Sequence, residues 1–156
     1  MFTGRMWALV ADDETLFPDI DFSALDEVEL TETVASETKW TYVIDYRTRQ
    51  MATTDDGRPK KTATYGEYLV QTALKILNTE RFQYVVYDAD IGVERSEWAN
   101  WEDVEIKRDI EEALAAHTEI SQAEVLSMER NGQNMYLRIK LTGLAGEVEL
   151  EEAIEL

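Results

Sequence analysis

Residues 119–141, EISQAEVLSMERNGQNMYLRIKL, are the stretch that decides the fold. Two runs of alternating apolar and polar residues flank the pair Asn131-Gly132. This pair is a strong signal for a hairpin turn, because both residue types tolerate φ above zero at the central turn positions. We therefore predict antiparallel strands over about 119–128 and 135–141, joined at the Asn-Gly pair.

The chain after this hairpin predicts one more strand, over 147–156. Val148 and Leu150 alternate there with glutamates, so one face is apolar and the other is acidic. Edge strands commonly carry charged side chains that prevent unwanted pairing with other chains. We therefore expect this acidic strand to lie at the edge of the sheet.

Two helices are predicted before the hairpin. Apolar residues recur at helical spacing over 65–78, and Thr64 with Glu67 forms a capping-box sequence at the start of that helix. The second helix spans about 101–116, and His117 lies at the end of its apolar face.

Two further strands are predicted from short stretches of aromatic and β-branched residues. Trp40 to Tyr46 alternate as in a half-buried strand, and Phe82 to Tyr87 indicate a buried strand or an extended segment. The complete order is strand, helix, strand, helix and three strands. It predicts an α+β fold, in which two helices pack on a small, mostly antiparallel sheet with a C-terminal hairpin and an acidic edge strand.

The composition excludes several classes of function. The 156-residue chain has a net charge of −18, which disfavours contact with nucleic acid or an anionic membrane. It has no cysteine and one histidine, which excludes disulfides, thiolate zinc sites and multi-histidine metal sites within one chain. No apolar run approaches the ~18 residues of a membrane span. We therefore expect no cofactor, no nucleic-acid partner and no membrane partner.

The acidic residues are concentrated at the two ends of the chain. Residues 1–38 contain ten acids and one base, and residues 144–156 contain five acids and no base, whereas residues 39–143 have the more balanced composition of a folded domain. The first segment is interpreted either as a solvated, frayed terminus or as an arm that orders on a partner. Its apolar residues favour the arm, and the residues expected to dock are Leu16, Phe17, Ile20 and Phe22.

No residue pattern predicts a catalytic or metal site. His117 is expected to be a core or helix-end histidine, and no Gly-x-Ser-x-Gly elbow accompanies it. The sequence Asp88-x-Asp90-x-Gly92 departs from a calcium loop at its third ligand position.

Two other functions remain open from the residues alone. Paired carboxylates among Glu94, Glu97 and Glu102 would make the protein a peptidoglycan hydrolase of the lysozyme type. A third interpretation is an acidic adaptor that mimics nucleic acid and binds a basic protein in a salt-sensitive way.

Three stretches together carry a family resemblance. They are Trp40–Tyr46, the run Ala73–Tyr87 followed by Ile91–Glu94, and Ile106–Leu114 followed by the hairpin and the acidic last strand. In this order and spacing the chain resembles the XkdS-like family of contractile-tail phage baseplate proteins, which are relatives of the wedge proteins that act as sheath initiators. The resemblance covers about residues 39–156.

The resemblance implies a structural role in the virion. A protein of this family is expected in six copies around the tail tube, assembled in the host cytoplasm. It would bridge baseplate wedge proteins and tube-proximal baseplate proteins to the first ring of the tail sheath protein. The sheath subunits of such tails are linked by exchanged strands, so an initiator must offer an open sheet edge. The residues expected at that sheath-facing edge are Tyr136, Arg138, Lys140, Val148, Leu150 and Ile154.

Overall fold

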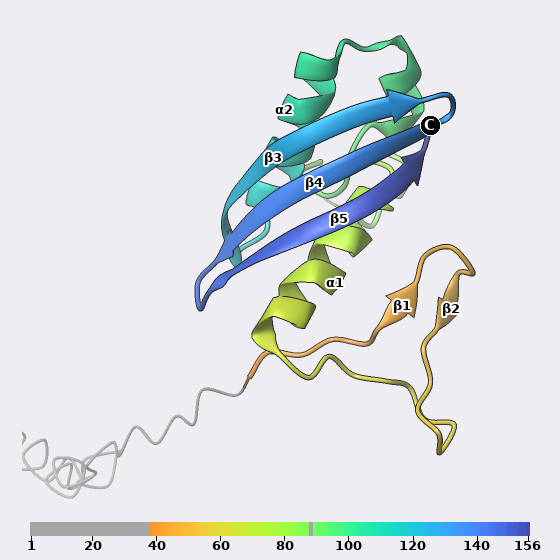
Figure 1. The fold of residues 1–156 in the computed structure, drawn as a ribbon, viewed down its shortest axis with the longest axis vertical. Helices are drawn as coiled ribbons and strands as arrows, with labels where there is room; N and C mark the ends of the chain where they lie inside the picture. Colours follow the sequence, from red (N-terminus) through yellow and green to blue (C-terminus); the bar gives the residue numbers. More distant parts are fainter. Residues whose placement is uncertain (1–37, 88) are drawn as a thin grey trace, which may run out of the picture. The chain divides into compact units, whose positions relative to one another are not determined.

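Three long antiparallel strands from the C-terminal part of the chain form the main sheet (Figure 1). They are β3 (Ile120–Asn131), β4 (Asn134–Gly143) and β5 (Glu147–Glu155). The order is β3-β4-β5, so β5 lies at an edge and pairs with β4 alone among the described strands. The predicted hairpin and the predicted acidic edge strand are therefore both confirmed.

The hairpin turn differs from the prediction in one respect. Asn131 pairs with Asn134, so the two central turn residues are Gly132 and Gln133 rather than Asn131 and Gly132. Of these two, only Gly132 has a positive φ, 64°. This is the pattern of a type II′ turn, in which glycine takes the first central position.

The computed structural model describes residues 38–87 and 89–156. The expected arm over 1–38 lies outside this part of the chain except for Thr38, and so do its four docking residues, Leu16, Phe17, Ile20 and Phe22. Within the described residues, no helix combines the length and hydrophobicity needed to cross a bilayer.

Two helices cover one face of the sheet, α1 (Tyr65–Leu77) and α2 (Asp103–Ala115). They match the predicted helices at 65–78 and 101–116 within two residues. The Thr64 hydroxyl accepts a hydrogen bond from the Glu67 N–H at 3.2 Å, and the Glu67 carboxylate accepts one from the Ala63 N–H at 2.7 Å. The predicted cap of α1 is thus confirmed, with the glutamate reaching one residue further back.

The hydrophobic core lies between the helices and the inner face of the sheet. Because side chains alternate along a strand, alternate residues of β4 and β5 face the core, whereas the irregularities of β3 interrupt this alternation. Large, fully buried side chains come from both helices and from β3 and β4. They are Leu69, Leu77, Ile106, Ile110, Leu114, Ile120, Met135, Ile139 and Leu141. The α+β architecture with two helices on a small antiparallel sheet is therefore the observed one.

One buried element was not predicted. Residues Arg95–Asn100 form a short 3₁₀ helix, η2, which places Trp98 in the core with no exposed surface. A helix of this length has too few residues for a periodic apolar pattern, so the sequence carries no clear signal for it.

The first predicted strand does not join the main sheet. Trp40–Tyr46 is extended, but only Ile44–Asp45 forms a strand, β1, which pairs with β2 (Gln50–Met51). An isolated bridge between Tyr42 and Lys61 continues this separate β-structure. The Gln71 side chain of α1 accepts a hydrogen bond from the Ile44 N–H at 3.1 Å, so the hairpin packs on the helix instead of extending the sheet.

The predicted strand at Phe82–Tyr87 is wrong. These residues form an exposed loop that begins with a positive φ of 64° at Phe82, a conformation that interrupts a strand. The loop returns at Gly92, whose φ is 92°. The apolar composition predicted burial, but no strand is available beside this segment to pair with it.

The backbone at Gly92, where the loop ends, packs closely against the backbone of Thr79. A Cβ at residue 92 would lie 2.4 Å from the Thr79 carbonyl oxygen, whereas a Cβ at Gly57 would have open space around it. Both glycines have positive φ. We expect Gly57→Ala to cost about 1–2 kcal/mol through conformational strain alone, and Gly92→Ala to cost about 1–3 kcal/mol more through the clash. Urea unfolding of both variants measures this difference; equal losses would contradict it.

Candidate functional site

The free edge of β5 is the main candidate site. The Gly143 N–H donates to the Gly146 carbonyl at 2.8 Å, and the Leu156 N–H donates to the Gln133 carbonyl at 2.7 Å. Hydrogen-bonded and non-hydrogen-bonded pairs alternate along an antiparallel ladder. Even-numbered residues of β5 therefore bond to β4. The odd-numbered residues direct their backbone N–H and C=O groups away from the sheet: Glu147, Glu149, Glu151, Ala153 and Glu155.

Of these outward backbone groups, only the Glu155 carbonyl has a hydrogen-bond partner in the described part of the chain. The Arg95 guanidinium donates to the Glu155 carbonyl, at 2.9 Å from Nε. Arg47 lines a shallow surface hollow together with Glu151 and Ala153. The backbone of β5 is thus open for pairing from Glu147 towards Ala153 and is closed by Arg95 at its C-terminal end.

The opposite edge of the sheet is protected. β3 has an irregularity between Val125 and Ser127, where Leu126 is the extra residue of a bulge. At this bulge the Glu111 carboxylate of α2 accepts a hydrogen bond from the Val125 N–H at 2.9 Å. Bulges and bonded side chains are common protections of edge strands. Of the two edges, β5 is therefore the one suited to accept another strand.

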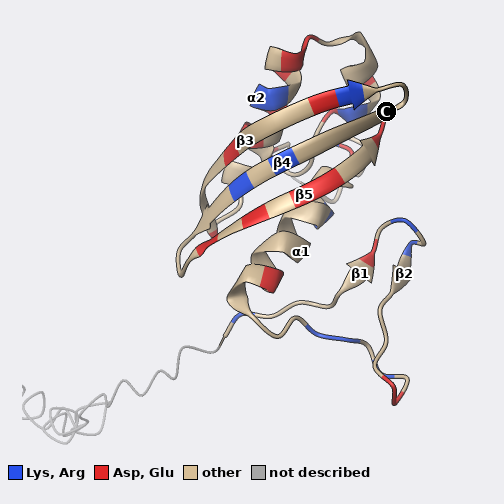
Figure 2. Cartoon of the chain, in the orientation of Figure 1, with Lys and Arg blue, Asp and Glu red and all other residues tan. Residues whose placement is uncertain are grey.

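The solvent-facing side of the sheet carries an ordered pattern of charge. Figure 2 shows basic residues on the central strand β4 and acidic residues on β5. Arg138 pairs with Glu151 at 2.8 Å, and Lys140 pairs with Glu147 at 3.0 Å. The hydrogen bond from Lys140 to Glu147 raises the pKa of this exposed lysine. Glu149 is the cross-strand neighbour of Lys140, and its charge also helps to raise the pKa of that lysine, although Lys140 forms its ion pair with Glu147.

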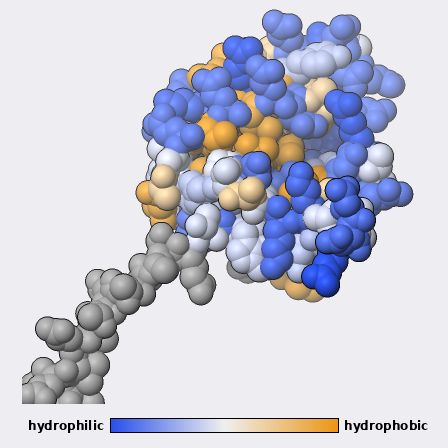
Figure 3. Space-filling model, turned by 60° about the horizontal axis from the view of Figure 1, so that its bottom comes forward, coloured by the Kyte–Doolittle hydropathy of each residue, from blue (hydrophilic) through white to orange (hydrophobic). Residues whose placement is uncertain are grey.

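An apolar strip lies under the free edge. Gly66 of α1 approaches Val148 of β5, because a Cβ on Gly66 would meet the Val148 Cγ2 at 3.7 Å. Val70 and Leu74 follow Gly66 at four-residue spacing, on the same flank of the helix, and both are only partly buried. Figure 3 views the side on which α1 and β5 lie and shows hydrophobic side chains in a hollow ringed by hydrophilic ones. A strand added to β5 could pack its inner side chains there.

The residues predicted at the sheath-facing edge divide between the two faces of the sheet. Tyr136, Arg138 and Lys140 lie together on the solvent face of β4, one strand in from the edge. The side chains of Leu150 and Ile154 are buried in the core, and Val148 is half-buried. The structure therefore brings the backbone of β5 and the solvent-face charges together, but it leaves two of the apolar side chains inaccessible.

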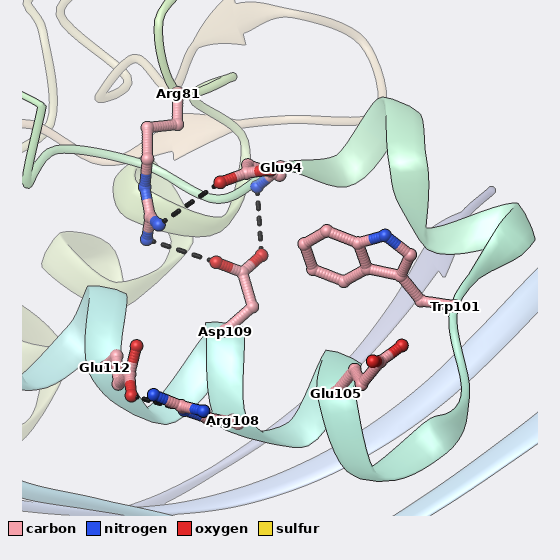
Figure 4. A pocket seen from close by; sticks show the side chains of 7 residues that line it. All are labelled: Arg81, Glu94, Trp101, Glu105, Arg108, Asp109 and Glu112. Carbon is pink, nitrogen blue, oxygen red and sulfur yellow. Dashed lines mark hydrogen bonds and ion pairs between the residues drawn. The ribbon is translucent and has the colours of Figure 1, made fainter.

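A second candidate region is an open cavity of about 360 Å³ beside α2 (Figure 4). Asp109 is buried at its base and accepts hydrogen bonds from the Trp98 indole at 2.8 Å and the Glu94 N–H at 2.9 Å. The Arg81 guanidinium lies 3.1 Å from Asp109 and 3.6 Å from the Glu94 carboxylate. The buried carboxylate is thus fully occupied in holding three segments together.

The carboxylates predicted for a hydrolase do not converge on this cavity. Glu94 lines it, but Glu97 and Glu102 do not. Glu102 is the N-cap of α2, where its side chain and that of Glu105 form a capping box. Within residues 38–87 and 89–156, no three His, Asp or Glu side chains gather as metal ligands would.

The sequence did contain a signal for Asp109 that was missed. Asp109 lies between Ile106, Ile110 and Ala113, on the apolar face of α2. A carboxylate at such a position is rarely buried without a paired cation. It therefore indicates an internal ion pair, although it does not identify Arg81 as the partner.

Another polar cluster joins the beginning of the described chain to the sheet. Glu119 is buried and binds Lys39, and the Tyr65 hydroxyl donates to it at 3.2 Å. The hydrogen bond from Lys39 lowers the pKa of Glu119. His117 is a helix-end histidine, as predicted, and its Nδ1 accepts a hydrogen bond from the Glu119 N–H at 3.2 Å. Burial lowers the pKa of His117, although the Glu119 charge opposes this effect.

The chain was compared with known proteins. No family model matches it. It is similar to the phage-like element PBSX protein XkdS of Bacillus subtilis (strain 168), with 28% identity over 147 residues, which cover 89% of this chain and 96% of that protein. The similarity extends along nearly the whole of both chains and relates this protein to a phage element.

The buried ion pair leads to one prediction. Asp109→Asn keeps the shape of the side chain but leaves Arg81 without its buried counter-charge, so we expect a loss of about 3–5 kcal/mol in the free energy of unfolding. Glu94→Gln is the matched control, because its longer and more exposed ion pair should contribute less than about 1 kcal/mol. Denaturant unfolding of both variants measures these losses. Similar losses for both would show that Asp109 is not the central partner.

The second prediction concerns pH. A histidine with a lowered pKa binds fewer protons in the folded state than in the unfolded state, so its contribution to stability is present above about pH 6.5 and declines as the pH falls below it. The slope cannot exceed about 1.4 kcal/mol per pH unit for one proton, and solvent around the ring makes it shallower. Unfolding between pH 7.5 and 5.5 should show this decline in the wild type and a flatter profile in His117→Gln. Identical profiles would refute the role of His117.

Proposed function

We propose that this protein is a non-enzymatic structural component of a contractile phage tail baseplate, which links wedge proteins to the first sheath ring and initiates sheath assembly. The similarity to a phage-element protein supports a phage structural role. The finer assignment rests on one observation, the long β5 edge whose backbone groups from Glu147 towards Ala153 have no partner among the described residues.

The proposed mechanism is strand addition to β5. A strand from the first sheath ring would bond to the outward N–H and C=O groups of Glu147, Glu149 and Glu151. Each such hydrogen bond contributes only about 0.5–1.5 kcal/mol net. Specificity must therefore come from side chains on the two faces of the added strand.

The chemistry of the partner strand follows from those two faces. On the solvent face it would meet the glutamates of β5, so we expect Lys or Arg there at alternate positions. On the inner face it would lie over Val148, Val70 and Leu74, so we expect aliphatic residues between the basic ones. The glutamates along β5 would also keep two free copies from pairing edge to edge.

The remaining parts of the proposal concern location and neighbours. Six copies would surround the tail tube in the virion baseplate, and residues 1–38 would dock on wedge or tube-proximal proteins. The proposal assigns no bond-breaking step. In its support, Asp109 and Glu94 share Arg81, and Glu97 and Glu102 lie outside the cavity.

Glu149→Pro tests the proposal at the open edge. Proline removes the outward N–H of residue 149, which bonds to nothing in β4, so the main sheet should remain folded. Glu149→Gln is the control, since it removes the charge but keeps the N–H. We expect Glu149→Pro to abolish sheath assembly on baseplates while circular dichroism and unfolding stay near wild type, and Glu149→Gln to retain assembly.

Two outcomes would contradict the proposal. Normal sheathed tails with a folded Glu149→Pro protein, seen by electron microscopy, would show that β5 accepts no strand. Release of fragments from purified peptidoglycan by the wild-type protein, lost on substitution of Glu94, would show that the protein is a hydrolase.

A further inference from the structure

Residues 82–87 and 89–91, which we call the apolar loop, expose six apolar side chains. Val85 and Val86 are 103% and 91% exposed and Phe82 is 70% exposed; half or nearly half of the surface of the other three apolar members, Tyr84, Tyr87 and Ile91, is also exposed. Folded proteins bury such a run unless it contacts a partner. The loop lies outside the β5 edge and takes no part in the strand addition proposed above.

The base of the apolar loop is firmly held. The Arg81 N–H donates to the Val93 carbonyl at 2.9 Å, and the Val93 N–H donates to the Thr79 carbonyl at 3.0 Å. The Arg81 side chain adds a bond to the Gly92 carbonyl at 3.0 Å. Because the base is fixed, less conformational entropy is lost when the tip is covered. The loop therefore holds its exposed apolar side chains on a fixed base.

Residues 40–61, which we call the basic hairpin, expose a second mixed surface. Trp40 is 49% exposed, and Lys61 Nζ lies 3.6 Å from the centre of its ring. Tyr42 and Met51 are exposed beside them on the same short β-structure. The basic hairpin contains five bases and three acids, a net charge of +2 in a chain of net −18.

The two surfaces are complementary in charge. Residues 80–97, which contain the apolar loop and its base, have five acids and two bases, a net charge of −3. Each surface thus offers aromatic and aliphatic side chains, and the net charges of the two segments are opposite in sign. Both surfaces are exposed in the same chain, so neither covers the other within one copy.

Backbone strain marks the same two elements. Among the described residues, only Arg49 and Phe82 have a positive φ without being glycine, at 55° and 64°. One lies in the basic hairpin and the other opens the apolar loop. Such conformations are energetically costly and concentrate at functional sites, where they orient side chains.

We propose that the apolar loop of one copy docks on the basic hairpin of a second copy. Val85, Val86 and Phe82 would pack against Trp40 and Met51, and acids near the loop would face the bases of the hairpin. Every copy carries both surfaces, so the contact can repeat from copy to copy and form a ring where the rotation closes. This inference is independent of the strand-accepting role of β5.

A lipid bilayer is the other apolar medium that such a loop could enter. The acids at positions 88 and 90 follow the apolar tip directly, and the chain as a whole is strongly acidic. The acids in and around the loop oppose approach to an anionic membrane, whereas the basic hairpin of a second copy, with its net charge of +2, would offer them bases. The observations therefore favour a second copy of this chain.

Sedimentation equilibrium of the full chain at physiological salt tests the proposal. The wild type should show a mass that rises above the 18.0 kDa of one chain as the protein concentration increases. The double variant Val85→Asp with Val86→Asp should lower the association constant more than about tenfold. Val104→Asp is the control and should associate like the wild type, because Val104 is 76% exposed on α2, outside both surfaces.

The basic hairpin is tested in the same way. Arg58→Glu with Lys60→Glu should also prevent association, while Lys107→Glu with Arg108→Glu on α2 makes the same change in net charge and should not. A mixture of the loop variant and the hairpin variant retains one intact loop and one intact hairpin. The mixture should form dimers and nothing larger.

Three outcomes would overturn the proposal. The first is a wild-type mass of one chain at all concentrations. The second is association that persists in the folded loop variant. The third is wild-type binding to phosphatidylcholine–phosphatidylserine vesicles, lost in the loop variant, without self-association, which would assign the loop to lipid.

Discussion

The buried carboxylate of Asp109 is the interaction on which much of the structure depends. It binds the indole of the core residue Trp98, the backbone of Glu94 and the guanidinium of Arg81. These three groups belong to the segment between the two helices, which has no long secondary structure of its own. The carboxylate thus ties both η2 and the base of the apolar loop to α2. A buried ion pair usually stabilises a core no more than well-packed apolar side chains would. Here it gives one defined arrangement to a segment of irregular backbone.

The two helices cover only one face of the sheet, and this asymmetry creates the surfaces available to partners. The solvent face of β4 and β5 carries cross-strand ion pairs, while α1 supports the underside of β5 without capping its backbone. β3 is treated differently, since α2 supplies Glu111 to the bulged position. The protein thus protects one edge and leaves the other exposed. Such a difference is expected where one edge has a use, because an open edge otherwise invites aggregation.

The parts of the fold with a clear period were predictable from sequence. The helices at 65–77 and 103–115 and the three C-terminal strands follow from apolar spacing, a capping pair and a turn glycine. Phe82–Tyr87 misled the prediction, because its composition indicates burial whereas its neighbours in space offer no strand to pair with. At the candidate site, the acidic edge was predictable, but the direction of its hydrogen bonds was not. That direction depends on the register with β4, which only the turn at 143–146 fixes.

The guanidinium of Arg95 on the Glu155 carbonyl has a geometric consequence for any strand that joins β5. It occupies the last outward acceptor, so an incoming segment meets a stop and cannot slide past the C-terminal end. A shift by one residue would exchange the two sides of that segment, leaving only shifts of two residues, about 7 Å, as alternatives. Because Arg95 occupies the Glu155 carbonyl, two-residue shifts of the added strand towards the C-terminal end of β5 are excluded. Arg95 would therefore limit how far an added strand can extend along β5, and so fix the position of the subunit that supplies that strand.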